Sequence, residues 1–346
     1  MPENRAAWLD ATGQKLRVGQ SELPKPGAGD IVVRNYAVAV NPLDFMYCPK
    51  AFRSAYIWLA DKIQDLRLFT ESWPTIVGFD IAGEVVEVGD GVQRFKKGDR
   101  VILHAPNRGG FQLYTLTNTK ATAILPSNIS FQEGAVFPVA FNAALVGLSS
   151  NGGLGLPLPS LEPEPSHKTI VVWGGSSSVG SFATPLATAA GAKVVAVAST
   201  QNADFCKHCG AVEVCDYKSS TVADNVVGAV KAAGGTFAGL VDAISIPDTV
   251  KPVLAILEAL GGGPLSTVLP VYQEDDVPSN VKPSFVHGYS PATFPLWENY
   301  VTPALQNGKL KCLPEPLVVG KGLEAIQEGL DRSKKGVSAK KVVIEL

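Results

Sequence analysis

TIVVWGGSSSVGSFATPLATAAGAKVVAVAST, residues 169–200, changes from strand-like to turn-like to helix-like composition and then back to strand-like composition. Residues 169–173 are apolar and mostly β-branched, as in a buried parallel strand, and an uncharged run of glycine and serine follows. Residues 181–190 are small and helix-compatible, and Gly191 can end that helix. Lys193–Ala198 is a second apolar strand. This order predicts one β-α-β unit of a doubly wound parallel sheet.

The turn between the first strand and the helix has the composition of a phosphate-binding turn. Gly175 and Gly180 match the first and third glycines of G-x-G-x-x-G, and Ser177 replaces the middle one. Small residues let the backbone approach a phosphate closely, and the N-terminus of the following helix favours an anion. The turn is therefore predicted to bind a dinucleotide through Gly175, Ser176, Ser177, Ser178, Val179 and Gly180. The alternative is that the small residues serve only close packing between helix and strand.

The end of the second strand indicates which dinucleotide is bound. NAD sites usually place an acid there for the ribose 2′-hydroxyl, but Ser199, Thr200, Gln201 and Asn202 follow this strand and the first acid is Asp204. A carboxylate would repel a 2′-phosphate, whereas hydroxyls and amides can bond it. We therefore expect NADPH, with Ser199, Thr200 and Asn202 as contacts. The alternative is a solvated polar loop.

The composition is that of a globular protein with a large core. The chain has 346 residues, of which 46% are hydrophobic and 18% charged, and its formal net charge is -2. No basic patch indicates nucleic acid or an anionic membrane, and no stretch resembles a transmembrane helix or a signal peptide. The five cysteines form no disulfide pattern. These features predict a reduced, cytoplasmic protein of two domains that binds neither nucleic acid nor a membrane.

Short strands and glycine turns dominate the N-terminal part. Residues 30–40 read as an alternating strand that Asn41-Pro42-Leu43-Asp44 closes. Pro42 holds Asn41 extended, and Asp44 is placed to cap the helix that follows. Further strands, punctuated by glycine, are expected within residues 75–115. The pattern predicts a mostly-β domain built as a partly open barrel.

The segment 45–74 is rich in aromatic residues, including Tyr47, Phe52 and Tyr56. Residues 54–69 have the spacing of an amphipathic helix. An aromatic segment after a turn can wall an apolar substrate pocket, and it can equally well be an extra helix packed on the core.

Three strings carry a resemblance to a known family. GFDIAGEVVEVGDGVQRFKKGDRV (78–101), with NPLD (41–44) before it and GGFQLYTL (109–116) after it, resembles the medium-chain dehydrogenase/reductase superfamily. The resemblance extends over nearly the whole chain. It implies an α/β architecture in which a GroES-like, mostly-β catalytic domain, residues 1–136 and 301–346, is split in sequence around a Rossmann NADPH-binding domain, residues 137–300.

The resemblance also allows a test for zinc. Zinc alcohol dehydrogenases of this superfamily have Cys where Asn41 stands and His where Phe79 stands, and neither Asn nor Phe can replace these ligands. The cysteine-rich zinc lobe has no counterpart, because residues 106–112 lead directly to the next strand. We therefore expect no metal and place the chain with the quinone oxidoreductases and enoyl reductases. The Gly/Pro-rich loop 151–166 resembles the insertion of fungal trans-acting enoyl reductases of polyketide pathways, the ToxD-like and lovastatin-type group.

Further contacts follow from the resemblance and from the carboxyl ends of the strands, which face the ligand crevice in such sheets. The expected cofactor contacts are Asn41, Pro42, Asp44, Asn142, Lys207, Tyr217, Thr267, Val268, Leu269, Val337 and Ser338. The expected substrate contacts are Phe52, Phe137, Val139, Phe141, Phe285, Val286, Gly288 and Tyr289. The alternatives are a helix-interior Asn142 bonded to its own backbone, a surface Tyr217 and a solvated Lys207.

The expected activity is enoyl reduction, which needs a hydride, a donor to the enolate oxygen and a proton for the α-carbon. Mitochondrial enoyl reductases of this superfamily have a tyrosine proton donor eight positions after the Asp of N-P-x-D, where this chain has Phe52. The candidate donors here are Tyr47, Tyr56, Asn142 and His287, with solvent as the alternative.

The resemblance thus implies an NADPH-dependent, zinc-independent enoyl reductase that reduces the C=C of an α,β-unsaturated acyl or polyketide chain. We expect it to work in trans with a polyketide synthase, as a monomer or a homodimer. The alternatives are an NADPH quinone or small-enone oxidoreductase, and a non-redox protein that reuses the fold.

Overall fold

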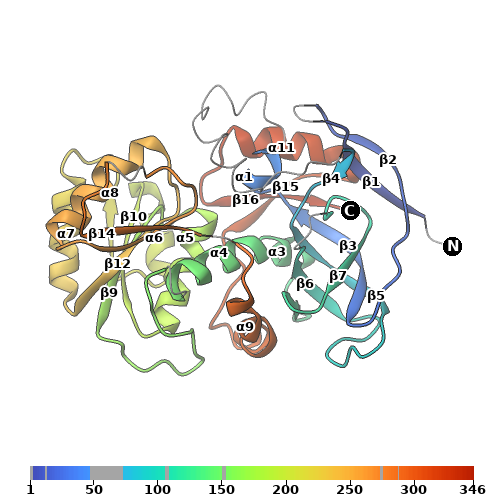
Figure 1. Ribbon diagram of the computed structural model, residues 1–346, viewed down its shortest axis with the longest axis horizontal. Helices are drawn as coiled ribbons and strands as arrows, with labels where there is room; N and C mark the ends of the chain where they lie inside the picture. Colours follow the sequence, from blue (N-terminus) through green and yellow to red (C-terminus); the bar gives the residue numbers. More distant parts are fainter. Residues whose placement is uncertain are drawn as a thin grey trace. The chain divides into compact units, whose positions relative to one another are not determined.

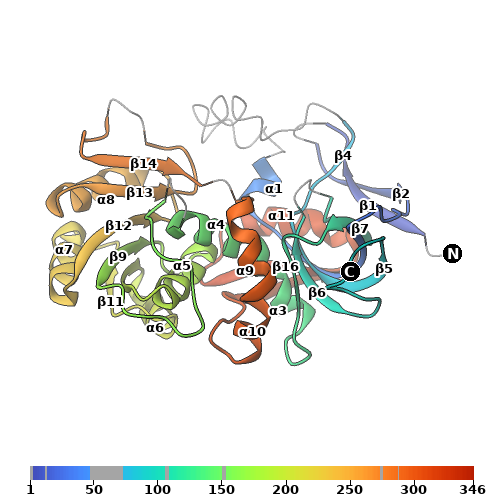
Figure 2. The same ribbon diagram turned by 60° about the horizontal axis from the view of Figure 1, so that its bottom comes forward.

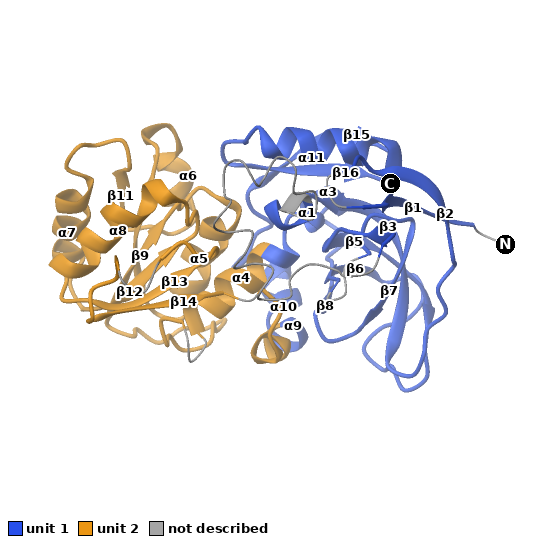
Figure 3. Ribbon diagram, turned by 45° about the horizontal axis from the view of Figure 1, so that its top comes forward, with its two compact units in different colours: residues 1–139, 297–346 blue, residues 140–296 orange. Residues whose placement is uncertain are grey.

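The computed structural model describes residues 3–11, 14–46, 73–105, 109–149, 153–272, 276–286 and 288–346. The expected helix at 54–69 lies outside these ranges. The chain divides into two compact units, one of residues 1–139 and 297–346 and the other of residues 140–296 (Figure 3).

The second unit is built on a six-stranded, all-parallel sheet (Figures 1 and 2). Its strand order is β11-β10-β9-β12-β13-β14. The strands are β9 (Lys168–Trp173), β10 (Lys193–Ala198), β11 (Glu213–Asp216), β12 (Thr236–Asp242), β13 (Gly263–Thr267) and β14 (Val281–Phe285). The order reverses direction beside β9, so a Rossmann doubly wound sheet, as predicted from the sequence, is confirmed.

Helices cover both faces of this sheet. They are α5 (Ser178–Ala189), α6 (Ala203–His208), α7 (Val222–Ala233) and α8 (Pro247–Ala259), and short 3-10 turns occur at η1 (Thr200–Asn202) and η3 (Pro291–Thr293). Figure 2 shows α5 and α6 on one face and α7 and α8 on the other. Right-handed crossovers require this arrangement, because the chain winds outward from β9 in opposite directions.

The first unit contains the mostly-β domain that the sequence predicts. A seven-stranded sheet has the order β15-β16-β3-β5-β6-β8, with β7 also paired to β3. Its members are β3 (Asp30–Ala39), β5 (Asp80–Val88), β6 (Arg100–His104), β7 (Tyr114–Asn118), β8 (Thr122–Ile124), β15 (Glu315–Lys321) and β16 (Lys340–Glu345). A smaller sheet joins β2 (Arg17–Ser21), β1 (Asn4–Leu9) and β4 (Thr75–Ile76). Fully buried apolar side chains, among them Ile81, Leu103, Phe111 and Ile344, fill the space between these strands.

One edge of β3 is shared between two partners. Residues 30–34 pair with β7, and residues 37–39 pair with β16, which comes from the other end of the sequence. The helices of this unit include α1 (Pro42–Met46), α3 (Phe131–Ala135), α10 (Val301–Gln306) and α11 (Ile326–Lys334), with the 3-10 turn η4 (Leu323–Ala325).

Proline interrupts two helical segments of the chain. Residues 294–306 form two helices, α9 (Phe294–Asn299) and α10, because Pro303 cannot donate a hydrogen bond and its ring would clash with a preceding carbonyl. α3 is likewise followed by a separate helix, α4 (Pro138–Ser149), since Pro138 lacks the donor that would continue the first helix.

The combined segment Phe131–Ser149 is long and apolar enough by composition to cross a membrane. However, 78% of its most apolar window is buried within the protein. It is therefore a core segment, as its break at Pro138 also indicates.

The loop expected at 151–166 is more firmly packed than a variable surface loop. Leu154 and Leu156 are buried, and their N–H groups donate to the carbonyls of Gly147 (3.0 Å) and Leu148 (2.9 Å) at the end of α4. Gly191 follows α5 with φ +76, and a Cβ there would lie 1.9 Å from the carbonyl oxygen of Glu164. The expected helix-ending role of Gly191 is thus correct, and the same glycine makes room for the loop.

Candidate active site

Residues 174–180, the glycine and serine segment predicted to bind phosphate and called the phosphate turn from this point, connect β9 to the first turn of α5. Ser177 is the N-cap of α5, and its side chain accepts a hydrogen bond from the N–H of Gly180 (3.1 Å). A Cβ on Gly180 would lie 2.1 Å from the carbonyl oxygen of Gly174, and one on Gly175 would lie 2.9 Å from the Cβ of Ala196. Both glycines are therefore required by close packing, whatever the turn binds.

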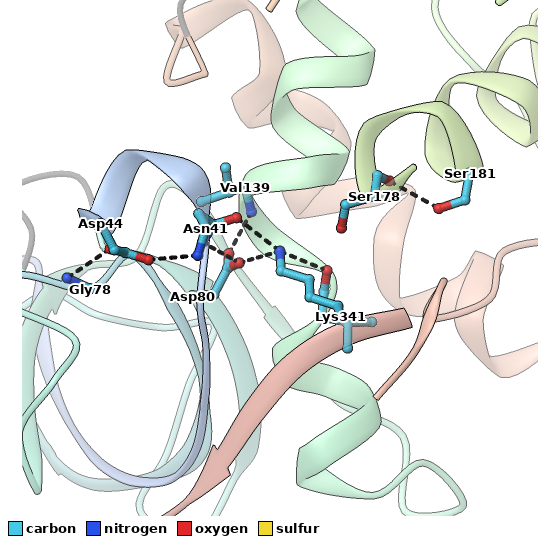
Figure 4. A network of polar contacts seen from close by, with 9 residues as sticks. Asn41, Asp44, Gly78, Asp80, Val139, Ser178, Ser181 and Lys341 are labelled. Atoms are coloured by element: carbon cyan, nitrogen blue, oxygen red, sulfur yellow. Dashed lines mark hydrogen bonds and ion pairs between the residues drawn. The ribbon is translucent and has the colours of Figure 1, made fainter. Parts of the chain in front are cut away.

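A second observation at this turn fits an anionic ligand. The Oγ of Ser178 is buried and has no hydrogen-bond partner in the described part of the chain. Buried polar atoms normally have partners, and Ser178 is the first residue of α5, where backbone N–H groups lack intrahelical acceptors. Figure 4 shows Ser178 on the first turn of α5, where its carbonyl accepts from the Ser181 hydroxyl (2.9 Å). The residues at this turn therefore fit the phosphates of a dinucleotide.

The expected adenosine-side residues gather at the carboxyl end of β10. The Nδ2 of Asn202 donates to the Oγ of Ser176 (3.1 Å), which joins the phosphate turn to the segment after β10. Ser199 is buried, and the N–H of Tyr217 donates to the carbonyl of Ala198 (3.3 Å). Lys207 is exposed on α6.

Two charged residues at this place were missed by sequence reasoning. Asp216 ends β11, beside the end of β10, and accepts a hydrogen bond from the Thr200 hydroxyl (2.7 Å). The Lys218 backbone N–H and the Thr200 hydroxyl hold the pKa of Asp216 below its usual range. The Nζ of Lys218 lies 5.8 Å from the Tyr217 ring centroid. An acid therefore does stand near the expected 2′-phosphate position, with a lysine close by in sequence.

The expected nicotinamide-side residues come together at the carboxyl ends of β13 and β14. Thr267 and Phe285 are paired across the two strands, and the N–H of Val286 donates to the carbonyl of Thr267 (2.8 Å). Val268 and Leu269 continue from Thr267. Gly288 and Tyr289 follow β14, and the Tyr289 ring packs edge-on against Phe294, with 5.3 Å between centroids.

Three expected contact residues on or beside α4 are fully buried. The Phe137 ring packs against Trp297 (5.7 Å between centroids) in the first unit, and the Phe141 ring packs against Phe182 (6.4 Å) in the second. Asn142 is fully buried on α4. Their roles toward cofactor and substrate stay predictions.

The first unit contains a buried ion pair that sequence reasoning did not find (Figure 4). The Nζ of Lys341 lies 2.5 Å from the Oδ2 of Asp80, and the two side chains are 4% and 0% exposed. Lys341 also donates to the Oδ1 of Asn41 (3.0 Å) and to the carbonyl of Val136 (3.3 Å), so its three protons have three acceptors. Asp80 accepts from the Nδ2 of Asn41 (2.8 Å) and from the N–H of Val139 (2.6 Å).

Asn41 therefore has a defined role in this structure. Its amide bridges the carboxylate of Asp80 and the ammonium of Lys341, a role that a thiolate could not fill. Phe79 is buried beside this network, with its ring 6.0 Å from that of His104. Among the described residues, no group of three or more His, Cys, Asp or Glu side chains is arranged to hold a metal.

Asp44 was expected to cap a helix that follows it, but its carboxylate accepts a hydrogen bond from a residue that precedes it. It lies within α1, and its carboxylate accepts from the N–H of Asn41 (2.7 Å) behind it and from the N–H of Gly78 (3.1 Å). The side chain is fully buried, and this burial raises its pKa to about 7. Asp44 therefore fixes the start of α1 against Gly78, two residues before β5.

Of the remaining expected residues, two precede β16 and four lie outside the described ranges. Val337 is half-buried and Ser338 is exposed ahead of β16. Tyr47, Phe52, Tyr56 and His287 lie outside the part of the chain that the structure describes.

A mostly-β unit and a doubly wound parallel-sheet unit with a glycine- and serine-rich turn after its first strand are the two domains of a nicotinamide-dependent dehydrogenase/reductase. Comparisons with known proteins agree with this assignment. Residues 27–138 match the alcohol dehydrogenase GroES-like domain, and residues 178–280 match the zinc-binding dehydrogenase family.

Full-length relatives are found among fungal proteins. The chain is 47% identical over 366 residues to Dehydrogenase orsE of Emericella nidulans, covering all of both chains. It is 36% identical over 357 residues to Trans-enoyl reductase himH of Aspergillus japonicus, covering 99% of this chain and 97% of that one. The fold is similar to that of an alcohol dehydrogenase superfamily protein from Novosphingobium aromaticivorans, with TM-score 0.76, 22% identity and 99% of each chain covered.

The chain belongs to the medium-chain dehydrogenase/reductase superfamily. It is therefore an oxidoreductase, and its nucleotide-binding fold indicates a nicotinamide cofactor.

The buried ion pair makes a specific prediction about stability. Lys341→Met would leave the Asp80 carboxylate buried without its cation, so we expect a loss of about 3–5 kcal/mol in the free energy of unfolding. Urea unfolding followed by tryptophan fluorescence measures this loss. The matched control is Lys340→Met, which removes an exposed lysine paired with Glu315 and should cost less than about 1 kcal/mol. Equal effects of the two substitutions would contradict the assignment.

The buried histidine beside this pair predicts a pH effect. Burial lowers the pKa of His104 to about 4, so its contribution to stability is lost as the pH falls from about 6.5 toward 4. Asp44 acts in the opposite sense, because a pKa raised to about 7 means that stability is lost as the pH rises from about 4 toward 7.

Substitution of His104 should remove its pH-dependent contribution to stability and leave that of Asp44. We expect His104→Leu to lose stability relative to the wild type as the pH rises from 4 to 6.5, by up to about 3 kcal/mol. Urea unfolding at a series of pH values gives this difference. A flat difference for His104→Leu would mean that this imidazole is not held neutral.

Proposed function

We propose that the protein is an NADPH-dependent, zinc-independent enoyl reductase that reduces the C=C of an α,β-unsaturated acyl or polyketide chain. The proposal includes action in trans with a polyketide synthase, in the cytoplasm, as a monomer or homodimer. The observation that supports it most directly is that a relative 36% identical over nearly the full length is named a trans-enoyl reductase.

The chemistry of the buried network agrees with a reductase that needs no metal. Alcohol oxidation on zinc requires ligands with lone pairs directed at the metal. Here the amide of Asn41 is committed to Asp80 and Lys341, and the neighbouring position is the apolar Phe79. Reduction of a conjugated C=C does not require such a Lewis acid, because the developing enolate can be stabilised by hydrogen-bond donors.

The second unit supplies the residues that would hold the cofactor. Ser178 Oγ and the first-turn N–H groups of α5 would bind its phosphates, and Thr267, Val268 and Leu269 would lie on its nicotinamide side. Ser199, Thr200, Asn202, Lys207 and Tyr217 would surround the adenosine 2′-phosphate. When bound, reduced nicotinamide supplies the hydride.

The reaction also needs a proton for the α-carbon and an apolar surface for the substrate. The α-carbon would be protonated by solvent or by one of Tyr47, Tyr56 and His287. Asn142 cannot act as an acid at ordinary pH, so its role would be hydrogen bonding rather than proton transfer. The expected apolar contacts Phe285, Val286 and Tyr289 would favour a hydrophobic acyl chain.

Activity is tested by titrating the purified protein with NADPH and NADH and then adding enoyl thioesters, quinones or small enones. We expect tight binding of a reduced nicotinamide and its oxidation on enoyl thioesters, without added metal and in the presence of a chelator. Turnover on quinones alone would replace the proposed substrate class. No binding of either cofactor would remove the redox function altogether.

Cofactor selectivity is tested by a pair of substitutions with opposite charge effects. Asp216→Asn removes a negative charge beside Thr200, so we expect the preference for NADPH over NADH to rise by about threefold. Lys218→Gln removes a positive charge near Tyr217 and should lower that preference by a similar factor. The dissociation constants of both cofactors give the ratio. Changes of the same sign in the two variants would show that no 2′-phosphate is bound there.

A further inference from the structure

A buried hydrogen-bond network lies at the carboxyl end of β12. We call it the Asp242 clasp and define it by Asp242, Ser245, Thr249 and Tyr272. All four side chains are buried, and Asp242 and Ser245 are fully buried. The carboxylate accepts from the Thr249 hydroxyl (2.6 Å) and the Tyr272 hydroxyl (2.7 Å) at one oxygen.

The other carboxylate oxygen holds the backbone that follows β12. It accepts from the N–H groups of Ile244 (3.0 Å) and Ser245 (2.8 Å). Ser245 has φ +49, a left-handed conformation that a non-glycine residue adopts only when its surroundings enforce it. Four donors can surround one buried carboxylate only if each of them is fixed in position. The network therefore restricts the conformation of the loop that follows β12.

The clasp is tied to the two backbone segments that flank a dinucleotide in this fold. On one side, the Ser245 hydroxyl oxygen accepts from the N–H of Val268 (3.0 Å), the first residue after β13. Tyr272 belongs to the same segment and anchors its far end. On the other side, Ile244 packs on the phosphate turn, because a Cβ on Gly174 would lie 2.5 Å from the Ile244 side chain.

We propose that the Asp242 clasp positions the nicotinamide half of the cofactor by holding the segment Val268–Tyr272 in register with the phosphate turn. The inference rests on the proposed function, since it needs a dinucleotide at this sheet. Asp242, Thr249 and Tyr272 are positioning residues that act through the backbone of Val268 and Leu269 and do not touch the cofactor.

Protonation is consistent with this role. Desolvation and the neighbouring Asp242 keep the pKa of Tyr272 far above its usual range, so its hydroxyl remains a donor throughout the physiological range. Burial raises the pKa of Asp242, and the Thr249 hydroxyl and the Ser245 N–H oppose that rise.

The test compares a whole cofactor with a fragment that lacks nicotinamide. For the wild type, Tyr272→Phe and Thr249→Val, the dissociation constants of NADPH and of 2′-phospho-ADP-ribose are measured by calorimetry. If the wild type prefers NADH, NADH and ADP-ribose replace them. We expect each variant to bind the reduced cofactor about tenfold more weakly, from the loss of one hydrogen bond to a carboxylate, and the fragment within about twofold of the wild type.

Two controls separate positioning from general damage. Thr249→Ser keeps the hydroxyl and should restore cofactor affinity relative to Thr249→Val. Tyr300→Phe removes the hydroxyl of another buried tyrosine, in the first unit, and should leave both affinities unchanged. If Tyr272→Phe does not fold, the Thr249→Val and Thr249→Ser pair decides the question alone.

Two results would overturn the inference. Equal weakening of cofactor and fragment would mean that the network only supports the fold, and unchanged binding of both would mean that the segment does not depend on the clasp. A wild type that binds neither reduced cofactor is a different outcome, because it rejects the proposed function itself.

Discussion

The first unit depends on the ion pair between Asp80 and Lys341. Two opposite charges removed from water are tolerable only when every remaining donor and acceptor has a partner, and here Asn41, Val136 and Val139 supply those partners. The pair thereby joins four segments that are distant in sequence: the start of α1, the start of β5, the break between α3 and α4, and β16. The position of each segment is restricted, because moving it away would leave the buried charge of Asp80 or Lys341 without a partner.

The second unit solves a similar problem with one charge rather than two. Asp242 is surrounded by hydroxyl and backbone donors, while the glycines of the phosphate turn let α5 pack directly against the ends of the strands. In both units a buried carboxylate gathers loops at the ends of strands. The two carboxylates differ in their partners. Asp80 is paired with the charge of a lysine that is distant in sequence, whereas Asp242 accepts directional hydrogen bonds from hydroxyl groups on neighbouring loops.

The sequence was informative where the pattern is local. The strand, turn, helix and strand of residues 169–198 were predicted with small errors at their ends, because burial and glycine spacing repeat over short distances. The breaks at Pro138 and Pro303 follow from proline geometry, which is also a local property. Asp216 and Lys341 could not be placed from the sequence alone. Asp216 is near the predicted cofactor contacts only because β11 pairs with β10 in the sheet. Lys341 contacts Asp80, which is 261 positions away in the sequence.

The position of β16 has a consequence for biosynthesis. This strand lies between β15 and β3 and carries Lys341, yet it is synthesised after all the other strands of its sheet. Residues 140–296 form a unit that is continuous in sequence and can fold during translation. The first unit cannot be completed until β16 is synthesised. Until then Asp80 lacks its lysine partner, and residues 37–39 of β3 lack their partner strand on one edge. Nascent chains therefore carry an incomplete sheet for most of translation. An unpaired strand edge of this kind is a template for pairing with another chain.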